Sequence, residues 1–237
     1  MSIAASIIAS TLNAGTPLLI AAAGIVIHEK SGVLNLGIEG IMLMGAVTGF
    51  TVTLSTGSFA LGFLAGAGVG ILLGLLFAFF TLGMHANQYA AGLALSLFGA
   101  GLSAFIGKPL QGQALAERSV SGFGEAFFSQ HLLVYGAWVL IAAVWYFLFR
   151  TRAGLVLRAV GESPQSAFAL GYPVLRIRLF AVLFGALCSG VAGAYLSLVY
   201  TPLWVEGMTA GRGWIALALV TFATWRPLRV VVGAYLF

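Results

Sequence analysis

The feature that most restricts the fold of this chain is a series of long apolar segments separated by short polar breaks. A helix needs about 20 residues to cross the hydrocarbon of a bilayer. Six segments have approximately this length, a seventh is shorter, and an eighth stops soon after it starts. They cover residues 3–27, 33–54, 59–82, 88–107, 131–149, 177–200, 213–225 and 230 onward.

Composition supports a membrane location for these segments. Only 7% of the residues are charged and 61% are hydrophobic, whereas soluble domains carry about 25% charged residues. The alternating strands of an outer-membrane barrel are missing, and helices satisfy their own backbone hydrogen bonds in lipid. We therefore expect an all-α integral membrane protein, a polytopic helix bundle of about eight spans in one domain, residues 1–237. The final run, "VVVGAYLF", is too short to span, so we expect the natural chain to be longer.

Basic residues predict which side faces the cytoplasm. The connection 150–178 carries five arginines against one acid, Glu162, and cytoplasmic loops are enriched in Lys and Arg. Because successive spans cross the membrane in opposite directions, "HEKSG", "MHAN" and "WRPLR" are expected on the same side as this connection. Eight of the eleven basic residues then face the cytoplasm. The formal charge of +5 is explained in this way, without a nucleic acid polymer as partner.

Small residues recur at every fourth position in two of the segments. Gly62, Gly66, Gly70 and Gly74 form one series, and 185–193 repeats the pattern. Such spacing makes a groove that lets another backbone approach closely. The groove serves either helix packing within one subunit or a dimer interface.

The usual chemical motifs are missing from the sequence. It has no P-loop, no G-x-S-x-G elbow and no aspartate, and Cys188 is the only cysteine. The histidines stand at the ends of segments and lack metal-ligand spacing. We expect neither enzymatic activity nor a cofactor or metal bound by this chain. Proton- or sodium-coupled carriers place carboxylates in mid-span, and only Glu39 comes near that position.

The basic connection 150–178 contains a short predicted helix at 164–170. Ser163 suits the N-cap, Pro164 the first helical position, and Gly171 the residue that ends the helix. A short capped helix with a basic flank can dock into a cleft of a partner, or it can be an ordinary surface helix.

The stretch "SGVLNLGIEG" is polar backbone between two apolar runs. Asn35 and Glu39 are four residues apart, so a helix sets both on one face. Gly32, Gly37 and Gly40 weaken that helix. Either Glu39 stabilises a helix N-terminus and pairs with Lys30, or the stretch is a broken helix near the inner gate.

Other polar and aromatic side chains within or beside the spans are candidates to line a pathway. With the two above, the gate or pathway candidates are Asn13, Asn35, Glu39, Asn87, Gln88 and Trp214. Polar side chains in bundles also bond neighbouring helices together, and Trp214 also suits an interfacial aromatic belt.

Two long motifs carry a family resemblance. "RAVGESPQSAFALGY" resembles the cytoplasmic coupling segment of ABC importer permeases. "EKSGVLNLGIEGIMLMGA" is similar to the branch that serves nucleosides and simple sugars, related to the ribose and branched-chain amino-acid permeases. The late stretch from Gly211 also fits that branch. The family more often has Asn and Glu or Ala where Ser163 and Gln165 stand here.

The resemblance implies a permease subunit in a bacterial or archaeal cytoplasmic membrane. Its implied partners are ABC ATPase subunits that bind ATP–Mg, a second permease subunit, an extracytoplasmic substrate-binding lipoprotein and membrane lipid. Nucleosides or related small polar solutes are the implied cargo, with simple sugars or other small solutes as the alternative. The residues implied in coupling to the ATPase are Arg158, Gly161, Glu162, Ala167 and Gly171.

Two further classes stay open from the residues. A secondary carrier or channel would transport without ATPases, and an assembly subunit would not depend on its pathway residues for transport.

Overall fold

A computed structural model describes residues 3–115 and 132–236, and this part of the chain is a helical membrane bundle. Six of its helices are long and apolar enough to cross a membrane. Three of the six continue into a turn of π- or 3-10 helix, labelled η. The spanning helices are α1 (Ile3–Lys30), α2 (Ile38–Thr56), α3 (Phe59–Ala78) with η1 (Phe79–Gly83), α4 (Gln88–Gly107) with η2 (Lys108–Leu110), α5 (Leu132–Arg150), and α8 (Val174–Tyr195) with η3 (Leu196–Tyr200).

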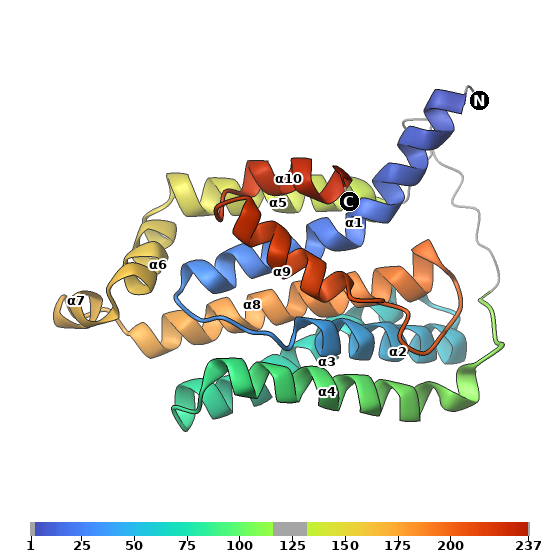
Figure 1. Ribbon diagram of the computed structural model, residues 1–237, viewed down its shortest axis with the longest axis horizontal. Helices are drawn as coiled ribbons and strands as arrows, with labels where there is room; N and C mark the ends of the chain where they lie inside the picture. Colours follow the sequence, from blue (N-terminus) through green and yellow to red (C-terminus); the bar gives the residue numbers. More distant parts are fainter. Residues whose placement is uncertain (1–2, 116–131, 237) are drawn as a thin grey trace.

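The last two helices are shorter, as the sequence predicted. α9 (Arg212–Phe222) and α10 (Pro227–Leu236) form an antiparallel pair beside α1. In Figure 1 the spans run along the long axis, and α9 begins in the middle of the molecule rather than at its end. The prediction of an all-α bundle is confirmed, with six full-length spans and these two shorter helices.

The basic connection forms two short helices at one end of the bundle. α6 (Arg152–Glu162) and α7 (Pro164–Ala169) project from that end in Figure 1. The caps of α7 are as predicted, because Ser163 Oγ accepts from the backbone N–H of Ser166 and Gly171 has a φ of 84°. The end of α1 and the α9–α10 turn lie at the same end of the molecule. Cytoplasmic segments predicted from charge therefore lie together.

The densest packing joins α2, α3 and α8 through their small residues. The glycine face of α3 is buried, and a side chain added to Gly70 would meet the backbone of Ala186 in α8. Gly190 of α8 in turn lies against Gly66. The groove was expected to serve either packing within one subunit or a dimer interface. Because α8 of the same chain fills it, the groove serves packing within one subunit.

The start of α2 differs from the predicted helix. The preceding residues 31–37, named here the α1–α2 linker, form turns and irregular backbone, and α2 starts only at Ile38. Irregular backbone, one of the two alternatives left open for this stretch, is therefore the one observed before Ile38, and Asn35 and Glu39 do not share one helix. The glycines at 32 and 37 weaken helix formation, and Asn35 Oδ1 accepts from the backbone N–H of Gly37 at 2.7 Å, which favours a turn over a helix.

The glycine groove gives a test of the packing between α3 and α8. Gly70→Ala places a methyl group against the Ala186 carbonyl, and overpacking of this kind costs about 1–3 kcal/mol. We expect a thermal unfolding midpoint several degrees below that of the wild type in the detergent-purified protein. Gly68→Ala is the control, because a side chain there meets nothing within 4 Å. Equal midpoints for the two variants would contradict this packing.

Candidate functional site

The carboxylate of Glu39 connects the beginnings of α2 and α9. Its Oε1 accepts from the hydroxyl of Thr209 and, at 2.9 Å, from the backbone N–H of Gly211. Its Oε2 accepts from the backbone N–H of Gly213 at 2.7 Å. These four residues are named here the α2–α9 junction. The first backbone N–H groups of a helix have no hydrogen-bond acceptor within the helix. For α9, Glu39 of another segment supplies this acceptor.

The local sequence explains why α9 can begin against this carboxylate. Gly211 has a φ of 84°, which favours glycine. Gly213 lies so close to α2 that an added Cβ would be 2.7 Å from the Cα of Glu39. Thr209 is fully buried and Glu39 is half-buried, so most of the junction is enclosed by the bundle.

The Glu39 carboxylate lies at two helix N-termini. A helix N-terminus is equivalent to roughly half a positive charge, and Glu39 stands in the first turn of α2 while it binds the first turn of α9. Hydrogen bonds with one charged partner are shorter and stronger than neutral ones. Lys30, the expected ionic partner, lies instead over the ring of Trp225, 5.8 Å from its centroid.

The α1–α2 linker is held by polar side chains of α4. Gln88 Oε1 accepts from the backbone N–H of Leu34 at 3.0 Å, and Ser96 Oγ donates to the carbonyl of Leu36 at 2.9 Å. Two predicted site residues, Asn35 and Gln88, are therefore brought together on this linker. Asn87 instead caps α4, where its Oδ1 accepts from the N–H groups of Tyr89 and Ala90.

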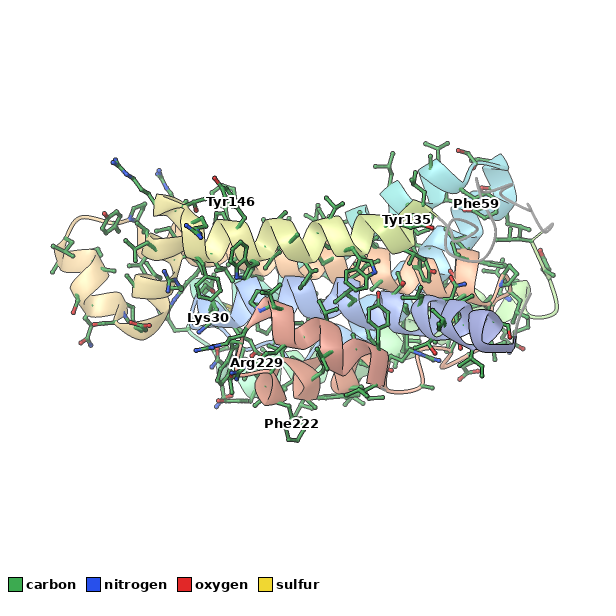
Figure 2. The ribbon with its side chains drawn as sticks, turned by 90° about the horizontal axis from the view of Figure 1, so that it is seen from above. Lys30, Phe59, Tyr135, Tyr146, Phe222 and Arg229 are labelled. Carbon is green, nitrogen blue, oxygen red and sulfur yellow. The ribbon has the colours of Figure 1, made fainter. Side chains whose placement is uncertain are left out.

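The C-terminal end of α1 contacts the turn between α9 and α10. The indole N–H of Trp225 donates to the Glu29 carboxylate. Thr224 and Trp225 have φ values of 54° and 52°, so the turn has an uncommon backbone conformation. Figure 2 shows Lys30 of α1 and Arg229 of α10 close to this end of the bundle.

The connection 150–178 contacts the same end of α1. Gly161 packs against the carbonyl of Lys30, and a side chain there would collide with it. Arg178 Nε donates to the carbonyl of Ser31 at 3.2 Å. The α1–α2 linker therefore contacts the basic connection at Ser31, where the linker begins. Glu39 of the α2–α9 junction comes just after the residue where the linker ends.

The other residues implied in coupling have varied surroundings. The guanidinium of Arg158 lies over the ring of Phe149 at 5.2 Å. Glu162 is exposed at the end of α6, and Ala167 is the buried residue of α7. Gly171 has the positive φ that ends α7.

The last two pathway candidates lie apart from one another. Asn13 of α1 accepts from the hydroxyl of Tyr195 at 2.8 Å. Trp214 follows Gly213 in the first turn of α9 and is 37% exposed, so it is a neighbour of the α2–α9 junction.

Sequence reasoning missed the partners of the two glutamates. Thr209, Gly211, Gly213 and Trp225 were not predicted as site residues. The run "TAGRG" carries a local signal for an irregular helix start. Its distance from Glu39 of more than 170 residues gives no local sign that the two segments meet.

Comparison with known proteins agrees with this architecture. Residues 7–237 match the family model of the branched-chain amino acid transport system permease component. A candidate glucose ABC transporter permease of Haloferax volcanii is 44% identical over 100% of this chain and 76% of its own length. A nucleoside ABC transporter permease of Lactococcus lactis is 34% identical, and a guanosine ABC transporter permease of Bacillus subtilis is 31% identical. Each alignment covers 98% of this chain and 79% of the relative.

These relatives come from bacteria and archaea, and their names describe ABC transporter permeases. The matches cover nearly the whole chain and agree with the helical bundle and with the two motifs quoted from the sequence. The chain belongs to the branched-chain amino acid transport system permease family and is an ABC transporter permease of the cytoplasmic membrane.

Proposed function

We propose that this chain forms the translocation pathway of an ABC importer for nucleosides or related neutral polar solutes. Two relatives are permeases for nucleosides and for guanosine, and the candidate glucose permease keeps simple sugars as the alternative cargo. The proposed partners are ATPase subunits that bind ATP–Mg, a second permease subunit and an extracytoplasmic substrate-binding lipoprotein.

The observation that carries a transport role is the α2–α9 junction. Non-helical backbone at membrane depth is tolerated only where protein or a water-filled cavity covers it. Discontinuous helices of this kind form substrate and gating sites in membrane transporters. Here two helices begin inside the bundle and share one carboxylate. We propose that Glu39 stabilises one of two arrangements of α9 and that its release changes the inner gate.

The contacts at the cytoplasmic end support a route for ATPase-driven motion. Movement of the connection 150–178 would act on the end of α1 through Gly161, and on the α1–α2 linker through Arg178. The linker leads directly to Glu39 and the start of α9. Rigid-body movement of packed elements is a common form of such transitions. We propose this route as the coupling between ATP hydrolysis and the gate.

The role of Glu39 is tested by Glu39→Gln. Glutamine replaces one acceptor oxygen with an N–H₂ donor that would face the N–H groups of Gly211 or Gly213. Loss of a charge-assisted bond costs about 1.5–3 kcal/mol. We expect uptake by the complete transporter to fall at least tenfold, while the yield of assembled complex in size-exclusion chromatography stays near that of the wild type.

Glu206→Gln is the control for this variant. Glu206 is an exposed carboxylate in the loop before α9, so the same chemical change there leaves the junction intact. Uptake by this control is expected at the wild-type level when the loaded binding protein is saturating. Wild-type uptake by Glu39→Gln would refute the gating role.

The coupling route is tested by Gly161→Ala. The added methyl group collides with the carbonyl of Lys30 and displaces α6 from the end of α1. We expect the number of solute molecules transported per ATP hydrolysed to fall several-fold in proteoliposomes. Gly136→Ala in α5 is the control, because a Cβ added there meets no atom within 4 Å. A ratio unchanged by Gly161→Ala would exclude this route.

The class of transporter is tested by reconstitution with and without partners. Proteoliposomes that contain the full-length permease, both kinds of partner and internal ATP are expected to accumulate labelled uridine or guanosine. Permease alone is expected to give no flux. Flux through the permease alone would favour the secondary carrier or channel, and accumulation of glucose in place of nucleosides would identify the sugar alternative.

A further inference from the structure

We propose that a polar cavity between α1 and the end of α8 is a contact site for the hydroxylated ring of the transported solute. This proposal rests on the proposed function. The cavity has a volume of about 630 Å³, within the range of about 300–1,000 Å³ typical of small-molecule sites. Its polar and aromatic lining consists of Ser10, Thr11, Asn13, Tyr200 and Thr201.

The cavity lies at the end of the bundle opposite the basic connection. Residues 10–14 of α1 line it on one side, and residues 199–201, in and after η3, line it on the other. α6 and α7 project from the far end of the bundle in Figure 1. By the charge distribution this is the extracytoplasmic end, where a loaded binding protein would release its solute. The α8 side of the cavity is formed by a turn of π-helix, η3, and such turns occur frequently at functional sites.

The lining chemistry fits a neutral solute rich in hydroxyl groups. Hydroxyls of Thr and Ser, and the amide of Asn13, can donate to and accept from a ribose or pyranose. The ring of Tyr200 offers an apolar face to a base or to the C–H face of a sugar. None of the described lining residues is charged, and Arg212 lies behind the ring of Tyr200 without lining the cavity. Nucleosides and simple sugars share the hydroxylated ring that this lining would recognise.

The larger cavity near the other end of the spans has a different character. It has a volume of about 780 Å³ and is lined by apolar side chains of α1, α3, α5, α6 and α8, among them Phe147 and Phe184. A surface of this kind suits lipid chains and offers hardly any hydrogen bond to a polar solute. Polar lining therefore marks the Asn13–Tyr200 cavity as the better solute site.

A chain of contacts links this cavity to the α2–α9 junction. The guanidinium of Arg212 lies over the ring of Tyr200 at 5.4 Å. Arg212 Nη1 also donates to the carbonyls of Met208 and Thr209, at 3.3 and 3.4 Å. The hydroxyl of Thr209 donates to Glu39. A solute that displaces Tyr200 would therefore act on Arg212 and on the residues that hold Glu39.

Substituted-cysteine labelling tests occupancy of the cavity directly. The native Cys188 is buried, so background modification is low. Thr11→Cys places a thiol on the cavity wall. Thr56→Cys is the matched control, because both threonines are exposed and donate to a carbonyl four residues earlier in their helices. The complete transporter in proteoliposomes is labelled with a membrane-impermeant maleimide in the presence of uridine, glucose or leucine.

We expect uridine or glucose to slow modification of Thr11→Cys at least threefold, and leucine to have no effect. Protection by uridine alone assigns the nucleoside, and protection by glucose alone assigns the sugar. The Thr56→Cys control is expected to react at one rate throughout. Absence of protection in a transporter that takes up uridine or glucose would overturn the proposal, as would equal protection by leucine.

Transport by Tyr200 variants gives a second, independent measurement. Tyr200→Leu removes the ring, and we expect the maximal uptake rate at saturating binding protein to fall about tenfold. Tyr200→Phe keeps the ring and is expected to stay within threefold of the wild type. Tyr146→Leu is the control, because Tyr146 lies on the outer face of α5, away from the cavity.

The two proposals fail in different ways. If the wild-type transporter takes up neither uridine nor glucose, the proposed function is wrong. If the wild type transports either probe and Tyr200→Leu transports it equally well, the cavity is not a solute site while the proposed function stands. Where Tyr200→Leu does not assemble, the labelling of Thr11→Cys decides.

Discussion

The carboxylate of Glu39 is the interaction on which the interior of this bundle depends. A backbone N–H without a partner costs several kcal/mol in hydrocarbon, and α9 begins inside the bundle with its first N–H groups directed at Glu39. Without that acceptor, the start of α9 would have to move to water or to another oxygen. A single side chain from a segment distant in the sequence therefore fixes where α9 begins.

The same part of the chain also holds the other end of α9. Glu29 and Lys30, at the end of α1, contact Trp225 just beyond the last turn of α9. Glu39 lies at its first turn. The stretch 29–39 therefore contacts α9 at both ends, and α9 would follow any displacement of that stretch.

Local signals in the sequence predicted much of the fold. Apolar runs predicted the spans, and Ser163, Pro164 and Gly171 predicted both caps of α7. The cytoplasmic orientation inferred from the arginines stays a prediction. The spacing of Asn35 and Glu39 left two alternatives open for the start of α2, and the turn chemistry of Asn35 and Gly37 decides for irregular backbone before Ile38.

The candidate site was harder to predict, because its contacts join distant segments. Glu39 was identified as a candidate from its isolation among apolar residues, but its bonds to Thr209, Gly211 and Gly213 arise from tertiary packing. The same holds for the glycine groove of α3, whose spacing predicted close packing without naming α8 as its partner. The roles of the gate, pathway and coupling residues stay predictions.

A carboxylate within the bundle need not imply transport coupled to an ion. An ionised carboxylate offers about four acceptor positions, and three donors of this chain already bind Glu39. Two helix N-termini further offset its charge. A cation bound at Glu39 would have to displace the donors that hold α9. The junction is therefore better suited to set the position of a helix than to bind an ion.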